Sequence, residues 1–203
     1  MDRSDIRLAV DALKGGALVV VPTDTVYGVA ADASVPGAEE KIYAVKKRDA
    51  GKPIPLLAAS VEAVKDYGAV LGGVETKLAG RFWPGPLTMV LKVPGCDGRG
   101  DEGFRVPDHA KVLDLLREAG GVLRVTSANE SGSPPALTAA EARAAFREHV
   151  EIVLDDGPAP GGTASTVVRV EEPDEAGKAE IVVLREGAIG KRKLAEIAPV
   201  RRA

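Results

Sequence analysis

Cysteine is almost absent from this sequence, since Cys96 is the only one among 203 residues. A single thiol excludes an internal disulfide framework and a metal site built from several thiolates. It also favours a reducing compartment, most simply the cytoplasm. Cys96 stands in a glycine-rich stretch with no neighbouring base, which predicts an inert surface thiol rather than a nucleophile.

Long hydrophobic runs are missing as well. The longest, such as residues 17–21, are far too short to span a bilayer, and residues 1–5 lack the apolar core of a signal peptide. The sequence therefore predicts a soluble, unexported chain with no membrane partner. With 45% hydrophobic residues and no shift in composition, residues 1–203 are expected to form a single domain.

Aromatic residues make up only 3% of the chain, and the formal net charge is −3. The charge gives no global nucleic-acid signature, and few aromatic rings are available to stack on bases. Basic residues do gather near the C-terminus, where a solvated basic tail is expected from about residue 190. RNA contact through that tail stays open; its cations are Lys191, Arg192, Lys193, Arg201 and Arg202.

Standard nucleotide and hydrolase motifs are absent: there is no phosphate-binding loop, dinucleotide fingerprint or nucleophile elbow, and His109 and His149 lack metal-site spacing. What remains is a set of cations and small polar groups: Lys46, Arg48, Lys52, Arg105, Arg185, Thr25, Ser127, Asn129 and Ser165. Such a set suits catalysis by positioning and charge neutralisation around phosphates and a zwitterion.

Apolar periodicity and cap signals alternate along the chain and predict an α/β fold. Helices are expected from a Ser4 cap to Gly15, over 38–48, from a Ser60 cap to Tyr67, over 76–82, from His109 to Gly120, and from a Thr138–Glu141 capping box to Phe146. Strands are expected over 17–21, 54–59, 87–93, 104–107, 122–125, 152–154, 165–170 and 181–184, with a mobile loop over 94–103.

Several polar groups admit two interpretations. The hydroxyl-rich stretch 22–28 follows a strand, where ligands bind in α/β folds, yet its threonines also suit turns and caps. Arg105 lies in a half-buried strand and needs an anionic partner, either an internal carboxylate or a ligand. Asp155 and Asp156 suit either magnesium or a turn, and the turn is the commoner use.

Seven stretches together resemble the YrdC-like L-threonylcarbamoyladenylate synthase family in its short, single-domain form. They are PTDTVYG at 22–28, KKRDAGKP at 46–53, FWPGPLT at 82–88, FRVPDH at 104–109, TSANESG at 126–132, STVV at 165–168 and LREGAI at 184–189. The resemblance covers nearly the whole chain, and the combination in this order is specific.

The resemblance implies a single α/β domain with a twisted mixed parallel and antiparallel sheet, flanking helices and a deep basic cavity. It implies that L-threonine, bicarbonate and ATP, with Mg²⁺, give threonylcarbamoyl-AMP and pyrophosphate for the threonylcarbamoyl modification of tRNA adenosine. It further implies a partner machinery that transfers the product to tRNA, with possible direct tRNA contact.

Carried over by position, the resemblance implies roles for single residues. Lys46 and Arg48 are expected to be the catalytic residues. ATP is expected to contact Lys46, Arg48, Lys52, Asn129, Thr138 and Arg185. L-threonine is expected to contact Thr25, Arg105, Ser127 and Ser165. Asp49 departs from the family's usual proline and suits a pairing with Lys52, while Leu57 replaces a histidine of a longer branch and is given no threonine contact.

Two other functions stay open. An RNA-binding module without catalysis would use Lys46, Lys47, Arg48, Arg105 and the basic tail to hold phosphates. A related carbamoyltransferase with another acceptor would need much the same cations. Preference for threonine over other acceptors separates this last function from the synthase.

Overall fold

The structure is a computed structural model that describes residues 1–49, 51–95, 100–130, 132–171 and 179–203, without the side chain of Glu148. Cys96 lies outside the described residues, so its predicted inertness stays a prediction. Among the described residues, no helix is both long enough and apolar enough to cross a membrane.

Seven α-helices and one 3₁₀ turn connect the strands in the described chain. The helices are α1 (Arg3–Lys14), α2 (Ala38–Lys46), α3 (Val61–Asp66), α4 (Gly73–Phe82), α5 (Ala110–Glu118), α6 (Ala139–Phe146) and α7 (Lys191–Ala195), and the turn is η1 (Arg147–His149). In α1, Ile6, Val10 and Leu13 recur at helical spacing and are buried. The capping box at Thr138 and Glu141 opens α6 as predicted.

Ten strands form one sheet in the order β10-β9-β8-β4-β5-β3-β6-β2-β1-β7. Their bounds are β1 Val19–Val21, β2 Gly28–Ala31, β3 Leu56–Ala58, β4 Leu87–Lys92, β5 Asp101–Arg105, β6 Val122–Ser127, β7 Ile152–Val153, β8 Thr166–Glu171, β9 Glu180–Arg185 and β10 Val200–Arg202. The sheet contains parallel pairs such as β3 with β5 and antiparallel pairs such as β4 with β5. The predicted mixed α/β sheet is thereby confirmed.

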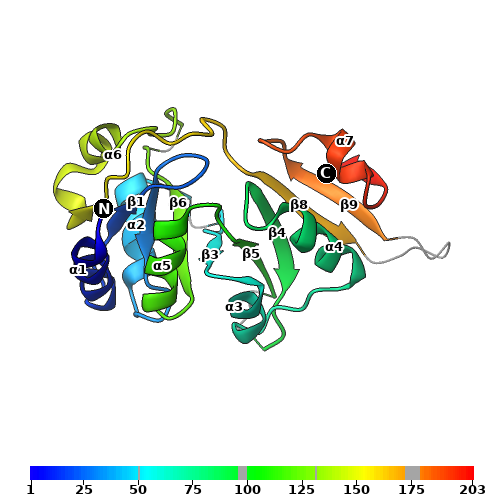
Figure 1. The fold of residues 1–203 in the computed structure, drawn as a ribbon, viewed down its shortest axis with the longest axis horizontal. Helices are drawn as coiled ribbons and strands as arrows, with labels where there is room; N and C mark the ends of the chain where they lie inside the picture. The colour runs from blue at the N-terminus through cyan, green and yellow to red at the C-terminus, as the bar shows by residue number, and fades with distance from the viewer. Residues whose placement is uncertain (50, 96–99, 131, 172–178) are drawn as a thin grey trace.

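Helices cover both faces of the sheet, and the elongated molecule places its two termini at opposite ends (Figure 1). On one face, α1 and α5 pack on Val19, Ala30, Leu123 and neighbouring side chains. On the other, α2 and α6 pack on Val20 and Val29, and α3, α4 and α7 pack on a separate cluster that includes Phe104 and Met89. Residues 154–165 run from β7 to β8 along the top of the view and join the two ends of the sheet.

The start of α1 differs from the prediction. Asp2, rather than Ser4, caps the helix, because its carboxylate accepts the backbone N–H groups of Ser4 and Asp5. Leu8 lies outside the buried face of the helix and is 60% exposed. A carboxylate at the cap also interacts favourably with the positive end of the helix dipole, which explains why it takes the role of the hydroxyl.

The sequence pattern missed β2 entirely and predicted β5 only in part. Residues 28–31 form β2, whose Gly-Val-Ala-Ala sequence is buried throughout and so shows no alternation. The predicted loop over 94–103 is wrong in its last part, since Asp101 to Gly103 belong to β5 and pair with β4. Glu102 is buried there and bonded to Arg124, which a sequence pattern alone does not reveal.

The C-terminal segment is not a solvated tail. Residues 191–195 form α7, and Val200, Arg201 and Arg202 pair in parallel with β9 as the edge strand β10. Leu194 is completely buried, and Arg201 and Arg202 form ion pairs with glutamates of β8, β9 and the following turn. One buried leucine and edge pairing are sufficient to dock the segment despite its charge.

Candidate active site

A cavity of about 240 Å³ lies over the middle of the sheet. Its walls come from β3, β4, β5 and β6, from the first residue of β2 and the last residue of β9, and from the loops that precede β2 and β8. All four residues expected to hold threonine line it, and so do two of the expected ATP ligands. Its polar lining includes Thr25, Thr88, Arg105, Ser127, Ser165, Arg48 and Arg185, and its apolar lining includes Val26, Pro55, Leu57 and Val125. The tertiary fold therefore gathers residues that are up to 160 positions apart in the sequence.

Arg105 is the buried cation of this cavity, with only 6% of its surface exposed. Its guanidinium donates to the Gly85 carbonyl at 3.0 Å and to Thr25 Oγ1 at 2.8 Å, and it forms an ion pair with Asp24. Of the two partners considered for Arg105, the structure supplies the internal carboxylate. An arginine carries five N–H groups, so these three contacts leave N–H capacity for a ligand.

The loop before β2 is shaped by its own hydroxyls. Thr23 Oγ1 accepts the backbone N–H groups of Thr25 and Val26 and donates to the Val26 carbonyl at 2.7 Å. Thr23 is therefore a turn residue, whereas Thr25 bonds Arg105 inside the cavity. Gly28 ends the loop where a Cβ would lie 2.6 Å from Val125 Cγ1, so only glycine fits without displacement.

Ser165 forms the opposite wall with two neighbours. Its Oγ is 2.8 Å from Thr88 Oγ1 and accepts a hydrogen bond from Arg185 at 3.1 Å, while Arg185 also donates to the Ser165 carbonyl at 2.9 Å. Partial burial lowers the pKa of Arg185, and the nearby charge of Arg48 lowers it further. Much of the residue stays exposed. Arg185 thus positions Ser165 and keeps its own charge at the mouth of the cavity.

Lys46 lies at the end of α2 and is 2% exposed. Its ammonium donates to the carbonyls of Ser127 and Asn129 at 2.5 and 2.7 Å and to Asn129 Oδ1 at 3.1 Å. Burial, followed by the charge of Arg48, lowers the pKa of Lys46 to about 8. The structure therefore brings Lys46, Ser127 and Asn129 together as one bonded group, with Ser127 Oγ 2.6 Å from Asn129 Oδ1.

The segment after α2 holds Arg48 at the cavity through backbone oxygens. Arg48 donates to the carbonyls of Lys52 and Pro53 at 3.0 and 3.2 Å. Lys52 itself is exposed and outside the cavity lining. The suggested pairing of Asp49 with Lys52 is absent from the described ion pairs, because the Asp49 carboxylate accepts the Gly51 N–H at 2.9 Å and closes the turn.

The cavity carries an excess of positive charge. Arg48, Arg105 and Arg185 all line it. Of these three arginines, only Arg105 has a carboxylate partner among the described residues. Like charges close together in a partly desolvated site favour a bound anion, because the anion relieves their repulsion. The site is suited to a polyanion together with a small carboxylate.

A second hollow of about 480 Å³ adjoins the cavity, and Pro135 lines both. Asn129, Leu137 and Glu141 also line this second hollow. Thr138 lines neither, because its hydroxyl accepts the Glu141 N–H as the cap of α6. Among the expected ATP contacts, the structure therefore brings Arg48 and Arg185 together, places Asn129 next to them, and leaves Lys52 and Thr138 apart.

The two acids after β7 have different partners. The Asp155 carboxylate accepts the Gly157 N–H at 3.0 Å, and Asp156 pairs with Lys111 and lies 3.6 Å from His109 Nε2. No group of three or more potential metal-ligating side chains occurs among the described residues. Thus Asp155 has the turn role considered for it, whereas Asp156 forms an ion pair with Lys111.

Sequence reasoning missed three groups in the middle of the sheet, two of which are at the cavity. Asp24 was given no partner and Thr88 no role, and the buried pair of Arg124 with Glu102 lay in a predicted strand and a predicted loop. The ion pair of Asp24 with Arg105 could have been predicted, because a buried arginine requires a carboxylate and Asp24 is the acid within the hydroxyl-rich stretch. Thr88 could not have been predicted in this way, because the alternation of side chains along β4 indicates only that Thr88 lies on one face of the strand.

Comparison with known proteins gives relatives that match most of the chain. The Sua5/YciO/YrdC family model, described as "Telomere recombination", matches residues 11–187. A Mycobacterium tuberculosis (strain CDC 1551 / Oshkosh) protein is 36% identical over 195 residues, covering 93% of this chain and 87% of its own length. The threonylcarbamoyl-AMP synthase of Rattus norvegicus is 35% identical over 190 residues, covering 85% of this chain and 65% of the rat protein.

Solved structures show the same fold. Sua5 of Pyrococcus abyssi, solved in complex with L-threonine, superposes with a TM-score of 0.88 at 30% identity, covering 99% of this chain and 60% of that one. Escherichia coli YciO superposes with a TM-score of 0.81 at 24% identity and covers 95% of this chain. The family match over most of the chain, the named synthase relatives and the shared fold lead to one conclusion: this chain belongs to the Sua5/YciO/YrdC family of threonylcarbamoyl-AMP synthases.

Proposed function

We propose that this chain forms threonylcarbamoyl-AMP and pyrophosphate from L-threonine, bicarbonate and ATP, as the first step of tRNA threonylcarbamoyl modification. The observation that carries the proposal is the cavity itself, where a buried Arg105 faces hydroxyls while Arg48 and Arg185 stand at its mouth. Arg105 with its neighbouring hydroxyls suits an amino acid, and Arg48 with Arg185 suits phosphates. The relative from P. abyssi was solved with L-threonine, which agrees with an amino acid at Arg105.

The carboxylate of threonine is proposed to bind the free N–H groups of Arg105, next to Thr25. Ser127 and Ser165 also line the cavity and supply hydroxyls to the rest of the amino acid. The phosphates of ATP are proposed to meet Arg48 and Arg185, and the nucleoside to extend past Pro135 toward Asn129 and the second hollow. Lys46 holds the Ser127–Asn129 segment in this arrangement through its three bonds.

In the proposed reaction, the threonine amine attacks carbon dioxide derived from bicarbonate and loses a proton, which gives a carbamate. A carbamate oxygen then attacks the α-phosphorus of ATP, and the bond from that phosphorus to the bridging oxygen of the β-phosphate breaks. Pyrophosphate leaves with this electron pair. The guanidinium groups of Arg48 and Arg185 neutralise the developing charge, and no side chain forms a covalent bond.

Magnesium is proposed to enter with ATP rather than through protein ligands. The cavity lining offers hydroxyls and guanidiniums, and the described residues hold no cluster of carboxylates to bind a divalent ion. The ion is then bound by phosphate oxygens and water. Direct contact with tRNA and a partner that accepts the labile product belong to the same proposal.

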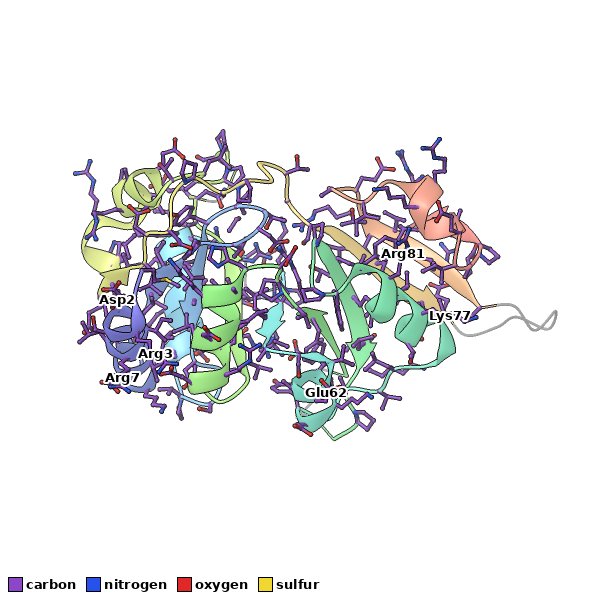
Figure 2. All side chains as sticks on the ribbon, viewed as in Figure 1. Asp2, Arg3, Arg7, Glu62, Lys77 and Arg81 are labelled. Atoms are coloured by element: carbon purple, nitrogen blue, oxygen red, sulfur yellow. The ribbon has the colours of Figure 1, made fainter. Side chains whose placement is uncertain are left out.

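The test measures pyrophosphate release from ATP with magnesium and bicarbonate, with and without L-threonine, together with the mass of the nucleotide product. Threonine-dependent release of an adenylate with the threonylcarbamoyl mass is expected. Lys46→Ala and Arg48→Ala are expected to lower the rate at least about a hundredfold, because each removes positioning or charge at the phosphates. Arg81→Ala, an exposed change on α4, is the matched control (Figure 2).

Normal release by both cavity variants would contradict the assignment of Lys46 and Arg48. Salt-dependent RNA binding without any threonine-dependent turnover would favour a binding module instead. Against that module, acids and cations share the surface at the start of α1, where Asp2 caps the helix that carries Arg3 and Arg7 (Figure 2). Equal turnover of other acceptors would favour a related carbamoyltransferase.

A further inference from the structure

Helix α2 carries Lys46 in its last turn, but its apolar contacts do little to fix how far along its own axis the helix lies. Its buried side chains are those of Ala38, Ile42 and Lys46, and its N-cap, Gly37, makes no side-chain cap bond. Apolar contact is non-directional, so one alanine and one isoleucine hold the helix on the sheet without fixing its axial position. Directional polar contacts are therefore needed to place Lys46.

Two polar contacts join α2 to the same strand, β6. In the first turn of the helix, Glu39 Oε2 lies 3.4 Å from Arg124 Nε. In the last turn, the Lys46 ammonium donates to the carbonyl of Ser127, the last residue of β6, at 2.5 Å. The helix advances about 10.5 Å from Glu39 to Lys46, and the strand advances about 10 Å from its arginine to its serine. Because the two spacings match, both contacts form at one axial position of the helix.

Arg124 is a fixed point for the first of these contacts. It is 3% exposed, and its two terminal nitrogens donate two bonds of 2.6 Å to Glu102 and one of 2.8 Å to the Ile54 carbonyl. Its Nε is buried and makes no hydrogen bond to a described residue. The contact with Glu39 is therefore an ion pair without a hydrogen bond, and burial strengthens its attraction.

The Glu39 carboxylate is contacted on both of its oxygens. Its Oε1 lies 3.4 Å from the hydroxyl of Tyr43, one turn further along α2. Only 14% of the Glu39 side chain is exposed, so water screens its charge little. The tyrosine thus leaves Oε2 directed at Arg124.

Resting on the proposed function, we propose that Glu39 is a positioning residue of the ATP site, which holds α2 at the axial position that places Lys46. Without the Glu39 charge, the helix keeps its apolar contacts but loses its first-turn attachment to β6, so its last turn shifts relative to that strand. Displacing a positioning group by about 1 Å is enough to slow a reaction by about a hundredfold. Glu39 is outside the cavity lining and acts through Lys46.

The experiment measures kcat and KM for ATP in pyrophosphate release at saturating threonine. Glu39→Gln keeps the shape of the side chain and removes its charge. Glu40→Gln, at the exposed neighbour, is the matched control, because it removes an acid from the same first turn and so has the same effect on the helix dipole. Calorimetric binding of ATP supplies the comparison where turnover is slow.

Glu39→Gln is expected to lower kcat/KM for ATP at least about tenfold and to raise KM about threefold or more. A variant that is merely less stable would lose kcat at unchanged KM, since KM does not depend on the fraction of folded protein. Glu40→Gln is expected to stay within about twofold of the wild type. In a Lys46→Ala background, Glu39→Gln should add no more than about twofold to the loss, because the group that it positions is gone.

An unchanged KM and kcat/KM in Glu39→Gln would overturn the proposal, as would an equal loss in Glu40→Gln or a full tenfold further loss in the Lys46→Ala background. If Glu39→Gln fails to fold, Glu39→Asp retracts the charge by one methylene and is expected to lose about threefold in kcat/KM. A wild type that releases no pyrophosphate with threonine, but whose ATP binding weakens in Glu39→Gln, would overturn the proposed function alone.

Discussion

Lys46 shows how a single residue combines structure with a titratable charge. Its ammonium is buried and bonded to three oxygens of the segment after β6, and burial lowers its pKa to about 8. An ordinary lysine in the unfolded chain keeps its proton to about pH 10.4. Between these two values the unfolded state binds more protons at Lys46, so its contribution to the free energy of unfolding rises with pH over that window.

The same pKa predicts a pH dependence of activity. Above about pH 8 the ammonium loses its proton, so its bonds to Ser127 and Asn129 weaken and the positive charge near the phosphates is lost. We expect kcat/KM for ATP to fall by about tenfold per pH unit above that value. The measurement is a pH–rate profile of pyrophosphate release at saturating threonine.

Lys46→Arg is the control for this profile, because a guanidinium keeps its proton throughout the range. Its activity is expected to be lower at pH 7 but to lack the fall near pH 8. A wild-type profile that is flat to pH 9.5 would contradict the assigned role of the Lys46 charge. A fall that persists unchanged in Lys46→Arg would assign it to another group.

At the scale of elements, close backbone approach fixes one wall of the site. A Cβ on Gly187 would lie 2.3 Å from the Ala164 carbonyl oxygen and 2.5 Å from the Ser165 carbonyl carbon. The turn after β9 therefore packs directly on the start of β8, where Ser165 faces the cavity. This contact is between two backbones, so no side-chain movement relieves the overlap.

Gly187→Ala is expected to shift Ser165 and to lower kcat/KM for threonine by about a hundredfold, the effect of displacing a positioning group by roughly 1 Å. A loss of about 1–3 kcal/mol in the free energy of unfolding should accompany it. Gly190→Ala, where a Cβ meets nothing within 4 Å, is the matched control. Normal threonine kinetics in Gly187→Ala would show that Ser165 does not depend on this contact.

At the scale of the whole molecule, a buried ionic group joins several elements in the middle of the sheet. Arg124 of β6 donates two bonds of 2.6 Å to Glu102 of β5, one of 2.8 Å to the Ile54 carbonyl, and lies 3.4 Å from Glu39 of α2. Both Arg124 and Glu102 are almost fully buried. The group crosses β3 and connects the helix that carries Lys46 to the strand that carries Arg105.

Removing one partner of this group is expected to lower the free energy of unfolding more than removing both partners. Glu102→Gln leaves the buried guanidinium short of charge and should lower the free energy of unfolding by about 3–5 kcal/mol. The double variant Glu102→Met with Arg124→Met removes both charges and should recover most of this loss. Urea unfolding followed by circular dichroism measures both, and equal losses in the two variants would contradict a coupled buried pair.

The C-terminal segment provides the second prediction at this scale. Leu194 of α7 is fully buried in the cluster beneath β8 and β9, so Leu194→Ala is expected to cost about 2–5 kcal/mol of unfolding free energy. Leu184→Ala, at an exposed leucine of β9, should change it by no more than about 0.5 kcal/mol. Equal effects of the two changes in urea unfolding would restore the solvated-tail interpretation of this segment.

The sequence by itself determined the α/β class, most helices and strands, and the residue types of the site. Some signals are local and can be identified from a few residues of sequence. Examples are the helix caps Ser60 and Thr138 and the all-valine run of β1. The tertiary structure alone decided which groups meet. Thr88 and Ser165 are 77 residues apart, and Arg105 finds Asp24 across 81.

The physical reason is that strand order and register, rather than spacing in the chain, set these contacts. β2 and β10 are strands only because neighbours pair with them, and Glu102 is tolerated in β5 only because Arg124 stands across β3. A local pattern carries no information on a partner supplied by another segment. The cations and hydroxyls were therefore predictable as a set, whereas their division among ligand, internal ion pair and cap was decided by burial in the folded sheet.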